Sequence, residues 1–166
     1  MTVPRIITLC TDFGTADGRA AALSGVLVSI AEELRLVTIS HDIPVDDILG
    51  AQRALQAAVP TFPALSVHLV CVSAQQTARR GFLAARLGDQ FFVAPNNGLV
   101  TPFLNCSQRS VVTLANPLFQ RSTGPHEIPA RDILAPAAAY LASGIPLEEL
   151  GPFLAEPLLL LQGKQS

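Results

Sequence analysis

Residues 5 to 40, RIITLCTDFGTADGRAAALSGVLVSIAEELRLVTIS, contain the pattern that decides the fold class. Arg5–Cys10 is an apolar, β-branched run, which is typical of a strand buried in a parallel sheet. Apolar residues then recur at helical spacing from Arg19 to Leu34, so we expect one amphipathic helix. Arg35–Ser40 is a second run that favours a strand. The order strand, helix, strand predicts the beginning of an α/β domain.

The alternation of helix and strand continues beyond residue 40. Asp46 is a suitable N-cap for a helix that ends near Val59, and Leu65–Val72 favours a third strand. The later elements are shorter: a hairpin of Phe82–Leu87 and Gln90–Ala94, a short helix over Asn97–Leu104, a strand over Ser110–Leu114, a loop over Asn116–Ala130 and a helix over Arg131–Ala142. The sequence therefore predicts one α/β domain over residues 1–152, a three-layer sandwich with a mainly parallel central sheet, and a C-terminal tail over residues 153–166.

The composition excludes several classes of protein. Of the 166 residues 49% are apolar and 14% are charged, against about 25% charged residues in an average globular chain, so the chain is not disordered. The net charge of −2, with scattered basic residues, argues against binding to nucleic acid. No uncharged apolar run reaches about 18 residues, so we expect no membrane span, and the N-terminus lacks a secretion signal, so we expect a cytoplasmic protein.

The three cysteines, Cys10, Cys71 and Cys106, do not have the spacing of a metal site. Two of them lie inside predicted strands. We therefore expect small buried hydrophobic side chains and no metal ion.

Polar residues follow the predicted strands where each strand ends. Asp12 follows the first strand, His41 the second, Ser73 the third, and Asn96 and Asn97 follow the strand near residue 94. In open α/β sheets, ligands bind beyond the carboxyl ends of the strands. We therefore expect these residues to line one polar crevice.

Each of these candidates also has a simpler structural interpretation. Asp12 could cap the turn that follows it, and His41 could be a satisfied structural histidine. Asn96 and Asn97 precede Gly98 in a good turn sequence, and Arg79 could be part of a solvated arginine pair. The chain has no glycine-rich phosphate loop and no nucleophile elbow. The residues alone therefore predict a ligand site without naming a reaction.

Six blocks of sequence lie in the order found in one known family and cover about residues 5 to 152. Four of them are ITLCTDFG at Ile7–Gly14, VTISHDIPVDDI at Val37–Ile48, FVAPNNGLVTP at Phe92–Pro102 and RDILAPAAAYL at Arg131–Leu141, and the other two are Phe62–Val72 and Ile145–Pro152. Together they resemble the S-adenosylmethionine hydroxide adenosyltransferases, whose fold the fluorinases and chlorinases share.

The resemblance implies a chemistry and a set of residues. Family members cleave the C5′–sulfur bond of S-adenosylmethionine, and hydroxide or halide displaces methionine. The aspartate that holds the ribose hydroxyls corresponds to Asp12, and the arginine that handles water corresponds to Arg79. The water-handling aspartate and histidine are replaced by Ser73 and Pro129, and the halide-binding serine by Ala130. Ser73 and Arg79 are thus the catalytic candidates. No cofactor is certain, and S-adenosylmethionine is the one implied.

The resemblance also implies an assembly. Family members have a second, β-barrel domain and form trimers in which S-adenosylmethionine lies between subunits, and the sequence ends about where that domain would begin. A chain so apolar and so weakly charged should bury surface by self-association. We expect a homo-oligomer, with a trimer favoured.

Three functions stay open from the sequence. The first, which we favour, is an enzyme that acts on a small, natural-product-like molecule by positioning it and excluding water, as a cyclisation or rearrangement requires. The second is residual cleavage of S-adenosylmethionine by hydroxide or halide. The third is a non-catalytic binding or interaction domain.

Overall fold

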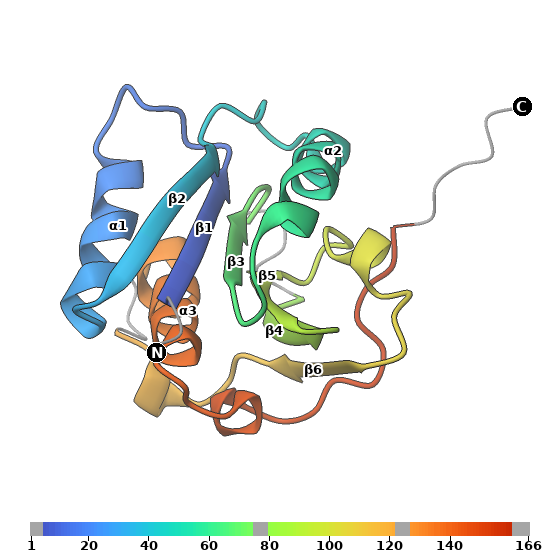
Figure 1. The fold of residues 1–166 in the computed structure, drawn as a ribbon. Coiled ribbons are helices and arrows are strands. Elements are labelled where there is room, and N and C mark those ends of the chain that lie inside the picture. The colour runs from blue at the N-terminus through green and yellow to red at the C-terminus, as the bar shows by residue number, and fades with distance from the viewer. Residues whose placement is uncertain (1–4, 75–79, 122–126, 161–166) are drawn as a thin grey trace, which may run out of the picture.

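A computed structural model describes residues 5–74, 80–121 and 127–160. Within these residues, six strands form one sheet in the order β2-β1-β3-β5-β4-β6 (Figure 1). The strands are β1 (Arg5–Thr11), β2 (Leu34–Ser40), β3 (Val67–Cys71), β4 (Phe82–Leu87), β5 (Gln90–Pro95) and β6 (Arg109–Thr113). Strands β2, β1, β3 and β5 run parallel, and β4 is antiparallel to both of its neighbours. The predicted α/β fold with a mainly parallel sheet is confirmed.

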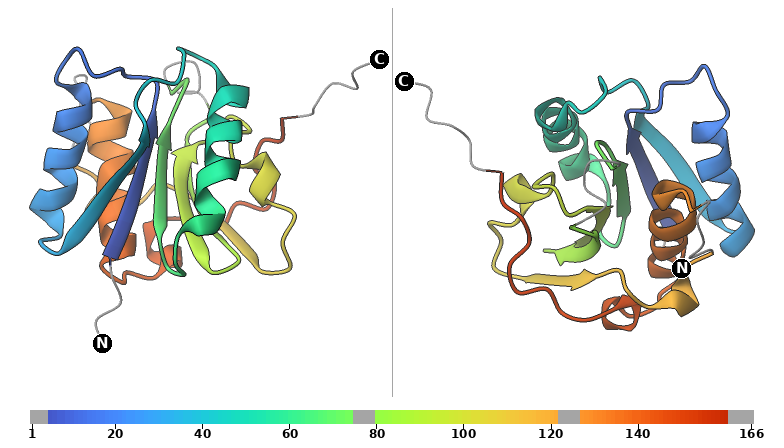
Figure 2. Two further views of the ribbon diagram at one scale, coloured as in Figure 1. Left: turned by 45° about the horizontal axis from the view of Figure 1, so that its top comes forward. Right: turned by 180° about the vertical axis from the view of Figure 1, so that it is seen from behind.

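Helices cover both faces of the sheet. Helices α1 (Arg19–Ile30) and α3 (Ala135–Ala142) lie against one face, and α2 (Ile48–Ala58) lies against the other (Figure 2). Successive strand residues point to opposite faces. Leu9 therefore packs in the core under α1 and α3, whereas Cys10 packs in the core under α2.

Two predicted helix ends were wrong by a few residues. Helix α1 ends at Ile30, not at Leu34, because Ala31 is already extended. The N-cap of α2 is Asp47, not Asp46: the Oδ1 of Asp47 accepts a hydrogen bond of 2.8 Å from the backbone N–H of Gly50.

Two other predicted helices differ from the structure. The helix expected over Asn97–Leu104 is a single 3₁₀ turn, Thr101–Phe103, because Gly98 has a positive φ of 87° that a helix does not allow. The helix expected from Arg131 begins as a π-helix, Ala130–Leu134, and continues as α3.

The described part of the predicted tail, residues 153–160, packs along the domain (Figure 1). The N–H of Leu154 donates to the carbonyl of Val111 on β6 at 2.7 Å. The N–H of Leu160 donates to Oγ1 of Thr101 at 2.9 Å. A Cβ on Gly98 would lie 2.8 Å from the Cβ of Leu160, so the close approach of the tail requires glycine there.

Two of the cysteines are buried, as the sequence predicted. Cys10 and Cys71 lie on β1 and β3, and burial, followed by the charge of Asp12, raises the pKa of each thiol to about 12. Cys106 is only partly buried, so the prediction was wrong for this cysteine. The described residues include no group of His, Cys, Asp and Glu side chains that is arranged to hold a metal ion.

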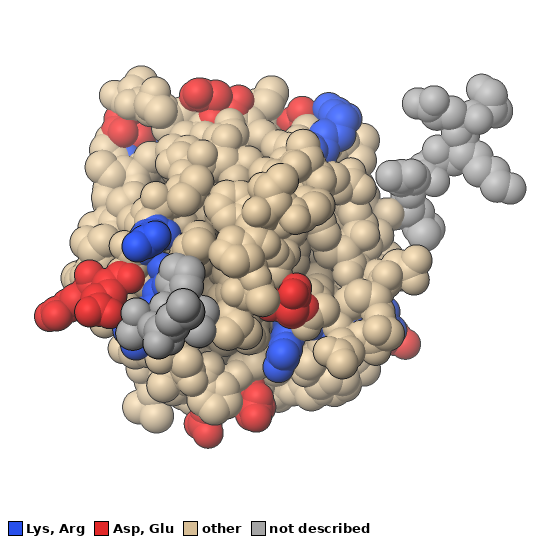
Figure 3. Space-filling view, in the orientation of Figure 1, with Lys and Arg blue, Asp and Glu red and all other residues tan. Residues whose placement is uncertain are grey.

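The surface carries few charges. On the face seen in Figure 3, acidic and basic side chains are interspersed and most of the surface is uncharged. None of the described helices has the length and hydropathy that crossing a bilayer requires.

Candidate functional site

The carboxyl ends of four adjacent parallel strands lie at one edge of the sheet. From β2 to β5 in spatial order, the chain continues into His41, Asp12, Ser73 and Asn97. The structure therefore places these predicted site residues at the same edge. Only two of them, Asp12 and Ser73, line the hollow there.

The carboxylate of Asp12 is held by backbone N–H groups. Its Oδ2 accepts a hydrogen bond of 3.0 Å from the N–H of Ser73 and a longer one of 3.4 Å from the N–H of Asp46. Both donor residues have a positive φ, 57° for Ser73 and 63° for Asp46, a conformation that is uncommon outside glycine and that clusters at functional sites. The other oxygen, Oδ1, has no hydrogen-bond partner among the described residues.

Two small hollows adjoin one another, and Asp12 lines the first of them. The first has a volume of about 200 Å³, and the second, more apolar one has a volume of about 130 Å³. Phe13, Arg19 and Ala74 line both. Residues that line only the first are Asp12, Val45, Asp46 and Ser73, and those that line only the second are Ala22, Leu23, Cys71, Ile128, Pro129, Ala130 and Arg131. A carboxylate thus lies beside an apolar pocket.

Arg19 contacts Phe13, which lines both hollows. Its guanidinium lies 5.1 Å from the centre of the Phe13 ring and donates to the Phe13 carbonyl at 2.9 Å. The same guanidinium forms an ion pair of 2.9 Å with Asp17. Arg19 is therefore occupied in positioning Phe13.

His41 supports the turn that carries Asp12. The hydroxyl of the buried Thr11 lies 2.8 Å from Nδ1 of His41, and the carbonyl of His41 accepts a hydrogen bond of 2.6 Å from the N–H of Gly14. His41 therefore holds both ends of the turn with Asp12 between them. Burial lowers the pKa of His41, so the imidazole is neutral at pH 7. Its predicted contact with a ligand stays a prediction.

The two asparagines make contacts within the chain. Asn97 donates from Nδ2 to the carbonyl of Val72 at 3.0 Å and accepts from the N–H of Leu99 at 3.3 Å. Asn96 accepts from the N–H of Leu158, in the tail, at 2.8 Å. Neither asparagine lines the two hollows. Arg79, the remaining predicted site residue, lies outside the described residues.

Residues 128–131 form one wall of the second hollow; the family resemblance had pointed to Pro129 and Ala130, but sequence reasoning missed Ile128 and Arg131. Asp132 anchors this wall, because its Oδ2 accepts from the N–H of Ile128 at 2.8 Å while Arg131 binds both carboxylate oxygens at 2.8 and 2.7 Å. The side chain of Asp132 is buried, and the hydrogen bonds from Arg131 hold its pKa below the ordinary value. A π-helix is frequently found at a functional site, but nothing in the local sequence predicts this one.

A family model matches most of the chain. The model, described as the SAM hydroxide adenosyltransferase N-terminal domain, matches residues 7–151. The chain is 35% identical to an (R)-S-adenosyl-L-methionine hydrolase of Salinispora tropica, over 94% of this chain and 60% of that protein. It is 36% identical to a hydrolase of the same name from Thermus thermophilus, over 89% of this chain and 61% of that one. A fluorinase of Nocardia brasiliensis is 27% identical, over 91% and 58%.

Solved structures have the same fold. A crystal structure of an uncharacterized conserved protein from Thermotoga maritima superposes with a TM-score of 0.87 and 27% identity, over 95% of this chain and 62% of that one. A crystal structure of a conserved hypothetical protein from Thermus thermophilus gives a TM-score of 0.78 and 31% identity, over 94% and 64%. The chain thus spans about 60% of the length of the relatives that it matches.

Proposed function

Because this chain belongs to the SAM hydroxide adenosyltransferase N-terminal domain family, we propose that its Asp12 site binds an adenosyl compound such as S-adenosylmethionine. We further propose that the chain is a repurposed enzyme, which positions a small molecule and excludes water. The observation that carries the proposal is the carboxylate of Asp12, a residue that lines a hollow and whose Oδ2 accepts a hydrogen bond from the N–H of Ser73.

The geometry of Asp12 suits a ribose diol. An ionised carboxylate only accepts hydrogen bonds and has about four lone-pair positions. The N–H of Ser73 uses one lone-pair position of Oδ2, and this hydrogen bond fixes the orientation of the carboxylate. The remaining positions accept hydrogen bonds from two adjacent hydroxyls without any movement of the side chain, so the cost of ordering Asp12 is already met in the folded chain.

The adjoining pocket is poorly suited to activating water. Its described lining has no carboxylate and no histidine. Pro129 has no titratable group, and Cys71, with a pKa of about 12, carries its proton at neutral pH. Ser73, in place of the family's aspartate, is a weak base. A pocket lined in this way excludes water from a bound reactive group and supports positioning chemistry.

The second candidate function is cleavage of S-adenosylmethionine by hydroxide. It is favoured by the 35–36% identity to proteins named (R)-S-adenosyl-L-methionine hydrolase. It also has a chemical basis in Asp46, an acidic residue that lines the same hollow as Asp12. A carboxylate there could accept a proton from a water molecule.

Calorimetric titration tests the binding step. We expect adenosine to bind, and 2′-deoxyadenosine to bind at least about tenfold more weakly, which corresponds to the loss of one hydrogen bond to a charged group. Asp12→Asn should weaken adenosine to a similar degree. Asp89→Asn, which removes an exposed carboxylate in the turn between β4 and β5, outside the hollow, is the matched control. Equal binding of adenosine and 2′-deoxyadenosine would contradict the proposal.

Chromatography separates the two candidate functions. S-adenosylmethionine incubated with the protein should release no adenosine in the favoured case. Release at about 1 per second or faster, a rate typical of enzymes, would establish the second candidate instead. Asp46→Asn should then abolish the release, while Asp42→Asn should leave it unchanged.

A further inference from the structure

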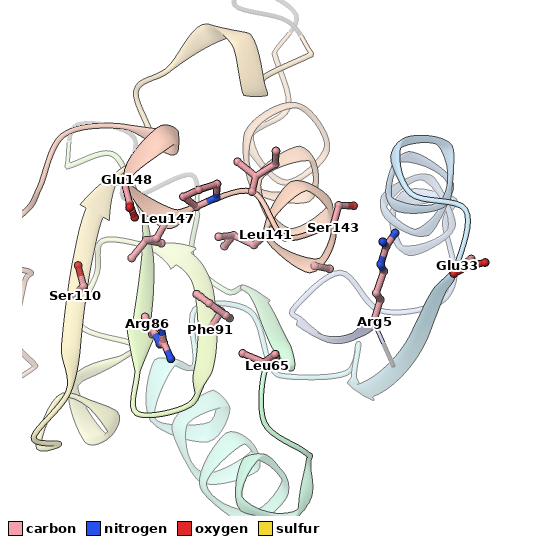
Figure 4. A pocket seen from close by; sticks show the side chains of 14 residues that line it. Arg5, Glu33, Leu65, Arg86, Phe91, Ser110, Leu141, Ser143, Leu147 and Glu148 are labelled. Carbon is pink, nitrogen blue, oxygen red and sulfur yellow. The ribbon is translucent and has the colours of Figure 1, made fainter. Parts of the chain in front are cut away.

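A larger hollow, shown in Figure 4, is lined by Arg5. Because Arg5 begins β1 and Asp12 follows its end, this hollow lies at the opposite end of the sheet from Asp12. Its volume of about 630 Å³ falls within the range of about 300–1,000 Å³ typical of small-molecule sites. It is bounded by the first residue of β1, by side chains of β4, β5 and β6, and by the end of α3 with the turn that follows. It shares no lining residue with the two hollows at Asp12, so it is a separate site.

One wall is a row of three side chains on adjacent strands. Arg86 on β4 lies directly opposite Phe91 on β5 and opposite Ser110 on β6, so all three project from the same face of the sheet. The guanidinium of Arg86 lies 5.8 Å from the centre of the Phe91 ring, and its Nε donates to the carbonyl of Gly88 at 3.3 Å. Arg86 has no ion-pair partner among the described residues. The row presents an aromatic ring, a cation and a hydroxyl together.

The end of α3 and the turn that follows it add apolar and acidic side chains to the lining. Leu141 and Leu147 are buried and form an apolar surface facing Phe91 (Figure 4). Glu148 stands at the rim, on the same side of the hollow as Arg86 and Ser110 in this view. The C-terminal end of α3 also borders the hollow, and a helix C-terminus carries a partial negative charge that attracts cations.

Charges of both signs therefore surround an apolar floor. At the other end of the hollow, Arg5 and Glu33 again provide one positive and one negative side chain. A simple anion would meet the glutamates, and a simple cation would meet the arginines. A zwitterion with an apolar body satisfies both kinds of charge and covers the floor.

We propose that this hollow binds an apolar amino acid or a short apolar peptide with free termini. The carboxylate pairs with the guanidinium of Arg86, which suits two-point recognition of a carboxylate, and with the hydroxyl of Ser110. The ammonium group pairs with Glu148 and the end of α3. The apolar side chain lies on Phe91 and Leu141. This site is independent of the function proposed for Asp12.

An NMR titration of ¹⁵N-labelled protein tests the proposal. L-phenylalanine and L-leucyl-L-phenylalanine should shift the amide signals of residues 86, 91, 110 and 141–148, and the tighter ligand of the two identifies the length that the hollow takes. The neutral compound N-acetyl-L-phenylalanine amide should bind at least about tenfold more weakly. Equal binding of the neutral compound, or shifts centred on residues 12–14, would overturn the proposal.

Substitutions localise the two charge contacts. Arg86→Met keeps the apolar stem and should weaken L-phenylalanine by at least about tenfold, and Glu148→Gln should weaken it less, because Glu148 shares the ammonium with the end of α3. Arg35→Met, on the exposed edge strand β2, is the matched control and should leave binding unchanged. Unchanged binding by Arg86→Met, or no binding of either ligand to the original protein, would overturn the proposal.

Discussion

The backbone N–H of Ser73 donates a hydrogen bond of 3.0 Å to Oδ2 of Asp12, 61 residues earlier in the chain. The bond joins the carboxyl ends of β1 and β3, which are adjacent in the sheet. The donor is the backbone of Ser73, whose φ of 57° is positive. The side chain at position 73 therefore matters for the conformation that it permits.

Substitutions at Ser73 test this relationship. Ser73→Gly keeps the N–H and permits a positive φ. Adenosine should therefore bind with a Kd within about threefold of that of the unsubstituted protein, a change of well under 1.4 kcal/mol in binding free energy. Ser73→Val should lower the free energy of unfolding by about 1–2 kcal/mol more than Ser73→Gly, because a β-branched residue is strained at this φ. Thermal denaturation and calorimetric titration measure the two effects. Equal stability of the two variants would show that the strain is unimportant.

The hydrogen bonds of His41 predict a role in positioning Asp12. His41→Leu removes the contact with Thr11 and should weaken adenosine about tenfold, while His41→Asn places an acceptor near Nδ1 and should restore most of the affinity. Burial lowers the pKa of His41, so the original protein should lose affinity only at pH values below the ordinary pKa of 6.5, and the Asn variant should lose less. Hydrogen exchange of the Gly14 amide gives a second measurement that needs no ligand. Unchanged exchange in His41→Leu would contradict the role.

The sequence was sufficient to predict that the candidate residues share one edge of the sheet, but not which of them line a hollow there. Parallel strands ending at a common edge follow from the alternating strand and helix patterns, and Asp12 and Ser73 do meet there. Asn97 satisfied the same criterion, yet its amide is used by the carbonyl of Val72. A polar residue after a strand is equally able to bind a ligand or to complete the backbone, and only the folded neighbours decide between the two.

The sequence could not predict features that depend on a shift of a single residue along the chain. Asp46 and Asp47 are adjacent and chemically identical, but Asp47 caps α2 while the backbone of Asp46 contacts Asp12. The row that Arg86 forms with its neighbours requires the pairing of β4 with β5 and β6. A one-residue shift of β4 would have turned Arg86 to the other face.

The buried carboxylate of Asp132 predicts a coupling between the π-helix and the site. Asp132→Asn should lower the free energy of unfolding by about 1.5–3 kcal/mol, the range for a hydrogen bond to a charged group. It should also weaken adenosine, because Ile128 loses its charged anchor beside the second hollow. Arg53→Gln, which removes a largely exposed ion pair with Asp47 at 4.0 Å, is the control and should change stability by less than about 1 kcal/mol. Chemical denaturation with urea and calorimetry provide the comparison.

The buried imidazole of His68 predicts how stability changes with pH. Burial lowers the pKa of His68 from 6.5 to about 4, and Nδ1 lies 2.8 Å from the hydroxyl of Thr8. Between these two pH values the unfolded chain binds a proton that the folded chain does not, so the free energy of unfolding falls as the pH decreases from 6.5 toward 4. Over this pH range His68 lowers the free energy of unfolding by about 3 kcal/mol.

The variant His68→Asn cannot take up this proton, so its free energy of unfolding should depend less steeply on pH in urea denaturation between pH 4 and 7. The comparison is one of slopes, so any cavity left between Phe62 and Phe92 does not affect it. Equal slopes in the two proteins would show that His68 has the same pKa in the folded and the unfolded chain, which would contradict the prediction.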